Sequence, residues 1–140
     1  MTIPSILLPV FVEVALVFIL LGLMARSRMD ALNTGVRPRD IALSSDAFPA
    51  RSRQISNCYA NQFEMPLLFI AAVILAIVVH HAGTLFVLVE WLFVIARIAH
   101  AVVHTTSNTV AIRGPLFLAS AVATALLWLL LALGVLFGIQ

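Results

Sequence analysis

Four runs of about twenty apolar residues constrain the fold of this chain more than any other feature of its sequence. A helix rises about 1.5 Å per residue, so a run of this length crosses the ~30 Å hydrocarbon core of a bilayer. Of the 140 residues, 63% are hydrophobic and 10% are charged. A soluble domain is about half apolar and about a quarter charged. The sequence therefore predicts an integral membrane protein.

The apolar runs predict a single domain over residues 1–140, with an all-α fold of four transmembrane helices. We expect the spans at 6–25, 53–79, 84–103 and 115–139. Pro66 should kink the second span, because proline lacks a backbone N–H and leaves the carbonyl of Gln62 without its helical partner.

The arginines predict how the bundle is oriented. All eight basic residues are arginines, and six of them lie between the first two spans. Arg113 lies between the third and fourth spans, whereas the termini and the His80-His81 turn carry no arginine. Because positive charge is retained on the cytoplasmic side, we expect the 26–60 segment there and both termini on the opposite side. The basic pI then reflects topology and does not indicate a nucleic-acid partner.

Polar side chains from three spans share one depth band near the arginine-rich side. Two of these polar residues lie three positions apart, on one face of the second span. Three more recur at helical spacing in the third span, and one lies at the start of the fourth. A carboxylate at this depth is costly unless it faces a partner or a water-filled site. The band consists of Asn61, Glu64, Arg97, His100, His104 and Arg113.

The residues alone leave several interpretations of this band open. Glu64 and Arg97 can form a structural ion pair inside the bundle. Alternatively, the band is a polar pocket that opens to the cytoplasm, and its excess of basic groups favours an anionic ligand. A metal site on His100 and His104 is less favoured, because no glutamate lies between them as in a zinc peptidase helix.

The polar motifs resemble those of the MAPEG family, the membrane-associated proteins in eicosanoid and glutathione metabolism. This family includes microsomal glutathione transferases, leukotriene C4 synthase and prostaglandin E synthase. The resemblance extends to the four-span layout and the long first loop, and the short chain is similar to the bacterial branch. The motifs are Asn61-x-x-Glu64 with Pro66 close behind, Arg97-x-x-His100-x-x-x-His104, and then Asn108 and Arg113.

The resemblance implies a homotrimer in a bacterial inner membrane, with no metal and with glutathione as co-substrate. Glutathione would lie between subunits near the cytoplasmic side, beside a lipophilic small molecule from the bilayer. Arg113 is the implied catalytic residue, because a positive charge beside the thiol stabilises the thiolate. Arg97 would be the structural partner of Glu64. The implied glutathione-binding residues are Asn61, Glu64, His100, His104, Arg113, Arg26, Arg28 and Arg53.

The chain departs from the family pattern at three places. Asn57 and Ala60 stand where the family usually has arginines, and Arg53 lies one turn further out, where it can substitute. His104 occupies a position where a tyrosine is common. Gly114 stands where the prostaglandin synthase branch has a serine, so we do not expect that activity.

Three functional hypotheses follow. The first is a glutathione-dependent transferase or peroxidase that acts on lipophilic electrophiles or lipid hydroperoxides. The second is a non-catalytic scaffold or accessory subunit of a membrane complex that retains the same fold. The third is a proton or ion pathway through Glu13, Glu64 and Glu90, which ranks last because these carboxyl groups fall in separate depth bands.

Overall fold

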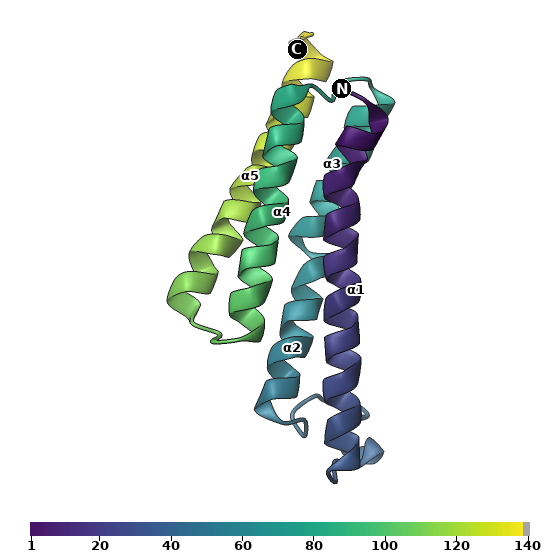
Figure 1. Ribbon diagram of the computed structural model, residues 1–140, viewed down its shortest axis with the longest axis vertical. Coiled ribbons are helices and arrows are strands. Elements are labelled where there is room, and N and C mark those ends of the chain that lie inside the picture. The colour runs from purple at the N-terminus through teal and green to yellow at the C-terminus, as the bar shows by residue number, and fades with distance from the viewer. Residues whose placement is uncertain (139–140) are drawn as a thin grey trace.

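The computed structural model describes residues 1–138, and in this part of the chain it is a bundle of helices without strands (Figure 1). Four segments are long and apolar enough to cross a membrane, so the protein is a multi-pass integral membrane protein, as predicted. One of these segments is made of two helices. The elements are α1 (Ile3–Asn33), η1 (Pro38–Ile41), α2 (Ala50–Ala60), η2 (Asn61–Phe63), α3 (Met65–Val78), α4 (Thr84–Thr105) and α5 (Val110–Phe137).

The spans run up and down, so that the start of α1 and the end of α5 lie at the same end of the bundle (Figure 1). We call this the terminal end; it also holds the turn at residues 79–83. The opposite end, called the loop end, holds residues 34–49 and the turn at 106–109. α4 occupies the centre and packs on α5, α1 and α2. Polar groups on the inner face of α4 are therefore enclosed by the other helices.

α1 is longer than the predicted span, because it continues for 31 residues to Asn33. Residues 26–33 contain neither glycine nor proline, and the helix ends at Thr34 and Gly35, where Gly35 has a φ of +114°. Beyond the predicted span, α1 packs beside α2, and Ser27 Oγ donates to Ser52 Oγ at 3.2 Å. The arginine-rich segment thus begins as a helix that extends past the α4–α5 turn (Figure 1).

The second span starts at Ala50 and is interrupted, where the sequence predicted only a kink. α2 ends at Ala60, η2 follows, and Glu64 has φ −99° and ψ −96°, outside any helical region. α3 then begins at Met65 with Pro66 in its first turn. Proline is favoured there because the first N–H groups of a helix have no intrahelical partner. The chain therefore starts a new helix at Met65, with Pro66 in its first turn, and does not bend a continuous one.

The fourth span starts earlier than predicted. Gly114 and Pro115 suggest a boundary, but α5 begins at Val110 and contains Pro115. The proline removes only the bond to the carbonyl of Ala111, and Ala111 is exposed. The polar connection between α4 and α5 is correspondingly shorter, and Arg113 lies within the helix.

The end of α5 is formed by Phe137 and by Gly138, which has a φ of +66° and caps the helix in the left-handed region. The predicted end of the span at Ile139 lies outside the described residues.

The apolar core lies toward the terminal end and joins α3, α4 and α5. Its centre is the stacked pair Phe69 and Phe93, whose ring centroids are 4.2 Å apart. By contrast, the outward faces of α1 and α5 carry exposed leucine, isoleucine and phenylalanine side chains. Such faces suit lipid or another membrane helix, and they leave the polar groups to be placed inside the bundle.

Candidate functional site

Three polar residues of α4 lie on its inner face in the half of the bundle nearer the loop end. Arg97, His100 and His104 are 0%, 2% and 3% exposed. Their spacing of three and four residues puts them on one side of the helix, and this side is the one that packs on the other spans. Charged and polar groups at such depth are costly unless polar partners meet them.

Arg97 connects α4 to the interruption in the second span. Its NH2 atom donates to the backbone carbonyl of Asn61 and to Gln62 Oε1, both at 2.9 Å. Gln62 is itself buried, and its Nε2 atom donates to the carbonyl of Cys58 at 3.1 Å. The guanidinium thus satisfies acceptors that the broken helix leaves free, and it holds η2 against α4.

The predicted ion pair between Glu64 and Arg97 does not form within the chain. Glu64 is exposed, and no salt bridge joins these two side chains in the part of the chain that the structure describes. The prediction assumed that Asn61 and Glu64 share a helical face. The non-helical backbone at Glu64 removes that periodicity and turns its side chain outward.

The side chains of His100 and His104 lie where α4 packs on the neighbouring helices. His100 Nδ1 is 3.1 Å from the backbone carbonyl of Arg113, and the His100 and His104 rings meet edge to face at 5.4 Å. Because a carbonyl only accepts, Nδ1 of His100 is the donor, which leaves Nε2 as an acceptor in the neutral ring. The carbonyl of His104 accepts from Gln54 Nε2 at 2.7 Å. The His100 ring is therefore oriented by a hydrogen bond, whereas His104 is held through its backbone and packs its ring against His100.

Arg113 lies in the first turn of α5 and is partly exposed at the loop end. Its NH1 atom donates to Asn108 Oδ1 across the α4–α5 turn. Asn108 adopts a φ of +51°, a left-handed conformation that asparagine tolerates better than most residues. Arg113 is joined to His100 through its backbone carbonyl, whereas its guanidinium contacts Asn108 in the α4–α5 turn.

Several buried nitrogen atoms of this region have no hydrogen-bond partner among the described residues. They are Arg97 Nε and NH1, His100 Nε2 and His104 Nδ1. Two of these atoms belong to a guanidinium and can only donate, His100 Nε2 accepts in the neutral ring, and His104 Nδ1 can donate or accept according to its tautomer. The cluster can therefore bind a polar or anionic group or ordered water, and it provides no carboxylate of its own.

The remaining predicted ligand residues do not join this cluster within one chain. Arg26 is exposed on α1. The Arg28 guanidinium lies 5.3 Å from the ring centroid of Phe48, and Arg53 NH1 lies 3.8 Å from Asp46 Oδ1. Each of these arginines lies at the loop end, so a contact with the cluster would have to come from a second copy of the chain.

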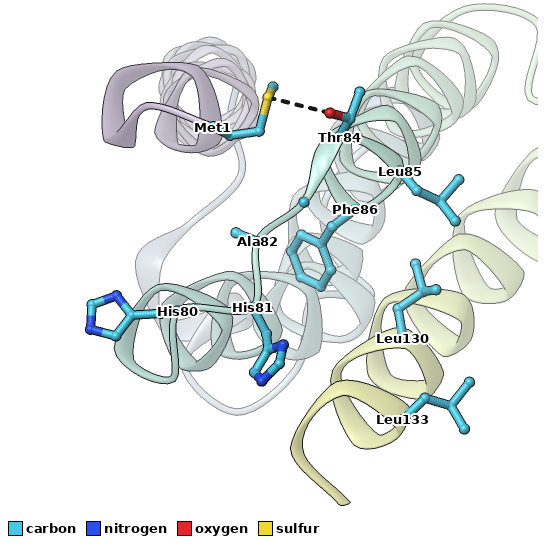
Figure 2. A pocket seen from close by; sticks show the side chains of 10 residues that line it. Met1, His80, His81, Ala82, Thr84, Leu85, Phe86, Leu130 and Leu133 are labelled. Carbon is cyan, nitrogen blue, oxygen red and sulfur yellow. Dashed lines mark hydrogen bonds between the residues drawn. The ribbon is translucent and has the colours of Figure 1, made fainter. Parts of the chain in front are cut away.

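A cavity of about 580 Å³ lies at the terminal end, on the opposite side of the membrane from the cluster. Figure 2 shows that His80 points outward from it, whereas His81 turns toward α5. The cavity lies far from every predicted ligand residue. It is lined by Met1, His80, His81, Ala82, Gly83, Thr84, Leu85, Phe86, Leu130 and Leu133.

The sequence interpretation missed one residue that contacts Arg97 and one that lies within electrostatic range of it. Gln62 was overlooked because it stands between two motif residues at a point where the helical period is lost. The sequence interpretation places Glu13 in a depth band separate from that of Glu64 and Arg97, yet its fully buried carboxyl lies within electrostatic range of Arg97. The signal was present, since Glu13 is the only charged residue in the predicted first span.

No group of three or more potential metal ligands occurs among residues 1–138. Comparison with known proteins gives one match: a family model described as "MAPEG family" matches residues 6–133. No curated protein and no solved structure matches the chain.

Proposed function

The chain belongs to the MAPEG family, and on this premise we propose that it is a glutathione-dependent transferase or peroxidase that acts on lipophilic electrophiles or lipid hydroperoxides. One observation carries the proposal beyond family membership. Arg97, His100 and His104 are buried at one depth of a membrane bundle, and four of their nitrogen atoms have no partner in the described chain. The free imidazole nitrogens of His100 and His104 can meet a polar ligand, and the arginines of the loop end supply positive charge for an anionic one.

Glutathione suits this arrangement because it carries two carboxylates, an amine and a thiol. We place it between subunits of a homotrimer, near the loop end. Asn61 and Glu64 lie at the interruption of the second span, where the exposed carboxylate of Glu64 can accept from the γ-glutamyl amine. Arg26, Arg28 and Arg53 of a neighbouring copy would supply charge for the carboxylates of the ligand, and His100 and His104 would line the inner wall.

Arg113 is the residue that we assign to the chemistry. The thiolate is the reactive form of a thiol, and a guanidinium beside it stabilises the negative charge. The thiolate can attack an electrophilic carbon, which forms a C–S bond and expels the leaving group. With a hydroperoxide it attacks oxygen, breaks the O–O bond and releases an alcohol. A second glutathione then displaces the sulfenic oxygen as water and forms the disulfide.

The lipophilic co-substrate would enter from the bilayer, because the outer faces of the helices are apolar. The arginine content of the 26–60 segment supports a cytoplasmic loop end in a bacterial inner membrane. Glutathione is then available on the side where the proposed site opens.

The first test is calorimetric titration of the detergent-solubilised protein with glutathione. We expect saturable binding that is lost in an Asn61→Ala/Glu64→Ala double variant. Asn33→Ala is the matched control, because Asn33 is exposed at the end of α1 and remote from the interruption. A folded protein that binds no glutathione would refute the proposal.

The second candidate is a non-catalytic scaffold or accessory subunit of a membrane complex. One observation favours it: Asn57 and Ala60 are exposed on α2 and carry no charge, where the family usually has arginines. A scaffold predicts a folded protein that stabilises a membrane partner, with no thiolate formed on bound glutathione.

A further inference from the structure

Two buried carboxyl groups have no role in the proposed function. Glu13 of α1 and Glu90 of α4 are both 0% exposed, and all four carboxyl oxygens lack a hydrogen-bond partner in the described chain. A buried carboxylate is costly unless a counter-charge or a polar network compensates it. The two residues differ in how they lie relative to Arg97, and this difference concerns the role of Glu13.

Glu13 lies within about one helical turn of the depth of Arg97. α1 and α4 run in the same direction and pack on each other, and Met1 Sδ lies 3.7 Å from Thr84 Oγ1 where both helices start. Glu13 is ten residues beyond the start of α1 and Arg97 is thirteen beyond the start of α4, a difference of about one helical turn. Long side chains lean toward the N-terminus of their helix, and the Arg97 side chain is longer than that of Glu13, so its guanidinium reaches further back and narrows the difference in depth.

The free atoms of the two side chains are complementary. The NH2 atom of Arg97 donates to Asn61 and Gln62, and its Nε and NH1 atoms have no partner in the described chain. Glu13 offers two acceptor oxygens that have no hydrogen-bond partner there, and its carboxyl lies within electrostatic range of the guanidinium without touching it.

Glu90 has a different environment. It lies two helical turns, about 10 Å, before Arg97 on the same helix. The residues one turn to either side of it, Phe86 and Val94 among them, belong to the apolar core. Glu90 is therefore as buried as Glu13 but is not a neighbour of the guanidinium.

We infer that Glu13 is the counter-charge of Arg97 and, through it, a positioning residue for the helix interruption that carries Asn61 and Glu64. No direct hydrogen bond or ion pair joins the two side chains among the described residues, so we place one bridging water between them. Neutralising the guanidinium inside the bundle lets Arg97 remain against the carbonyl of Asn61 and against Gln62. The expected effect of Glu13 on glutathione binding rests on the proposed function, whereas its effect on the position of the helix interruption does not.

Cys58 provides a local reporter of this arrangement. It is the only cysteine of the chain, it is fully buried, and its Sγ lies 3.9 Å from the carbonyl of Ala101. Its own carbonyl accepts from Gln62, the residue that Arg97 holds. Loosening of the Arg97 contacts should therefore expose the thiol to a maleimide.

The experiment compares three substitutions by the rate of maleimide labelling of Cys58 in detergent. Glu13→Gln keeps the size and removes the charge, Glu13→Asp keeps the charge, and Glu90→Gln is the matched control at an equally buried site. We expect Glu13→Gln to label about tenfold faster than the wild type, in keeping with coupling energies of neighbouring buried groups. Glu90→Gln should stay within about twofold, and Glu13→Asp should restore most of the protection.

Two results would overturn the inference. One is a Glu13→Gln variant that labels as slowly as the wild type, and the other is equal acceleration by Glu13→Gln and Glu90→Gln, which would indicate general loosening. Should Glu13→Gln fail to fold, the comparison of Glu13→Asp with Glu90→Gln decides: wild-type protection in the aspartate variant supports the role of the charge, and its loss opposes it.

Glutathione titration of the same variants separates this inference from the proposed function. We expect Glu13→Gln to weaken glutathione binding about tenfold and Glu90→Gln to leave it unchanged. Fast Cys58 labelling in Glu13→Gln with unchanged glutathione affinity would overturn the link to the ligand site. A wild type that binds no glutathione would refute the proposed function alone, and the labelling rates would still decide the positioning role.

Discussion

Arg113 is held at the start of α5 by two separate contacts. Its NH1 atom donates to Asn108 Oδ1, and its backbone carbonyl accepts from His100 Nδ1. Only the first contact depends on the side chain. The guanidinium can therefore be removed without disturbing the position of the histidine.

We predict that Arg113→Ala folds normally, loses the ultraviolet thiolate signal of bound glutathione, and lowers turnover by about 100-fold, the usual effect of removing one group that stabilises developing charge. Arg113→Lys should retain part of the signal, because it keeps the positive charge. An unchanged thiolate signal in the alanine variant would exclude Arg113 as the activating group. Bound glutathione without thiolate in the wild type would favour the scaffold.

The candidate site could be predicted only where the helix is continuous. The spacing of Arg97, His100 and His104 predicts one face of a helix, and all three are buried on the inner face of α4. The same argument failed for Glu64, because the backbone leaves the helical region there. Glu13 could not be paired from periodicity, since its neighbour lies on another helix and depends on how the two helices are aligned.

Among the elements, α5 and the turn before α4 meet at a very close approach. A Cβ atom built on Gly134 would lie 2.9 Å from His81 Nδ1, closer than real Cβ contacts. Gly22 of α1 has open space around the same position. These two helical glycines form a matched pair for substitution.

We predict that Gly22→Ala raises the free energy of unfolding by up to about 1 kcal/mol, because alanine has a higher helix propensity than glycine. Gly134→Ala should lower it by about 1–3 kcal/mol, the typical cost of overpacking. Thermal melting in detergent measures both. Adding His81→Ala to Gly134→Ala should recover the loss, and equal effects of the two glycine substitutions would show that the contact with His81 has no consequence.

The existence and type of the spans could be predicted from hydropathy, but their ends could not. The length of an apolar run shows which segment crosses the membrane but does not show where its helix ends in water. The prediction therefore ended the first span too early, because α1 continues to Asn33. Gly114 and Pro115 resemble a boundary, but a proline near the start of a long helix removes a single bond. In the second span the sequence predicts only a kink at Pro66, but the helix is interrupted there and a new helix begins.

At the scale of the whole molecule, the proposed ligand residues require more than one chain. Glu64, Arg26 and Arg53 are exposed and do not reach the buried cluster of their own chain. We predict a homotrimer, which native mass spectrometry of the detergent-solubilised protein would detect as a single species of three chains. A stable monomer that binds glutathione would contradict the placement of the ligand between subunits.

The orientation is testable with single cysteines in a Cys58→Ala background. Ser45 lies at the loop end and Thr84 at the terminal end, and both are exposed. In spheroplasts, a membrane-impermeant maleimide should label Thr84→Cys and should label Ser45→Cys only after the membrane is opened. The opposite pattern would place the loop end outside.

The overhang of α1 also affects how an anion would approach. The helix is roughly 46 Å long by its 31 residues, which exceeds the ~30 Å hydrocarbon core by about 15 Å. Six arginines follow from Arg26 to Arg53, so much of this charge stands about one Debye length, ~8 Å, or more above an anionic leaflet. At that height above the membrane, salt screens the repulsion between anionic lipid headgroups and an anionic solute. The arginines can therefore attract the solute there. We therefore expect the association rate of glutathione, measured by stopped flow, to fall as ionic strength rises, while the dissociation rate changes little.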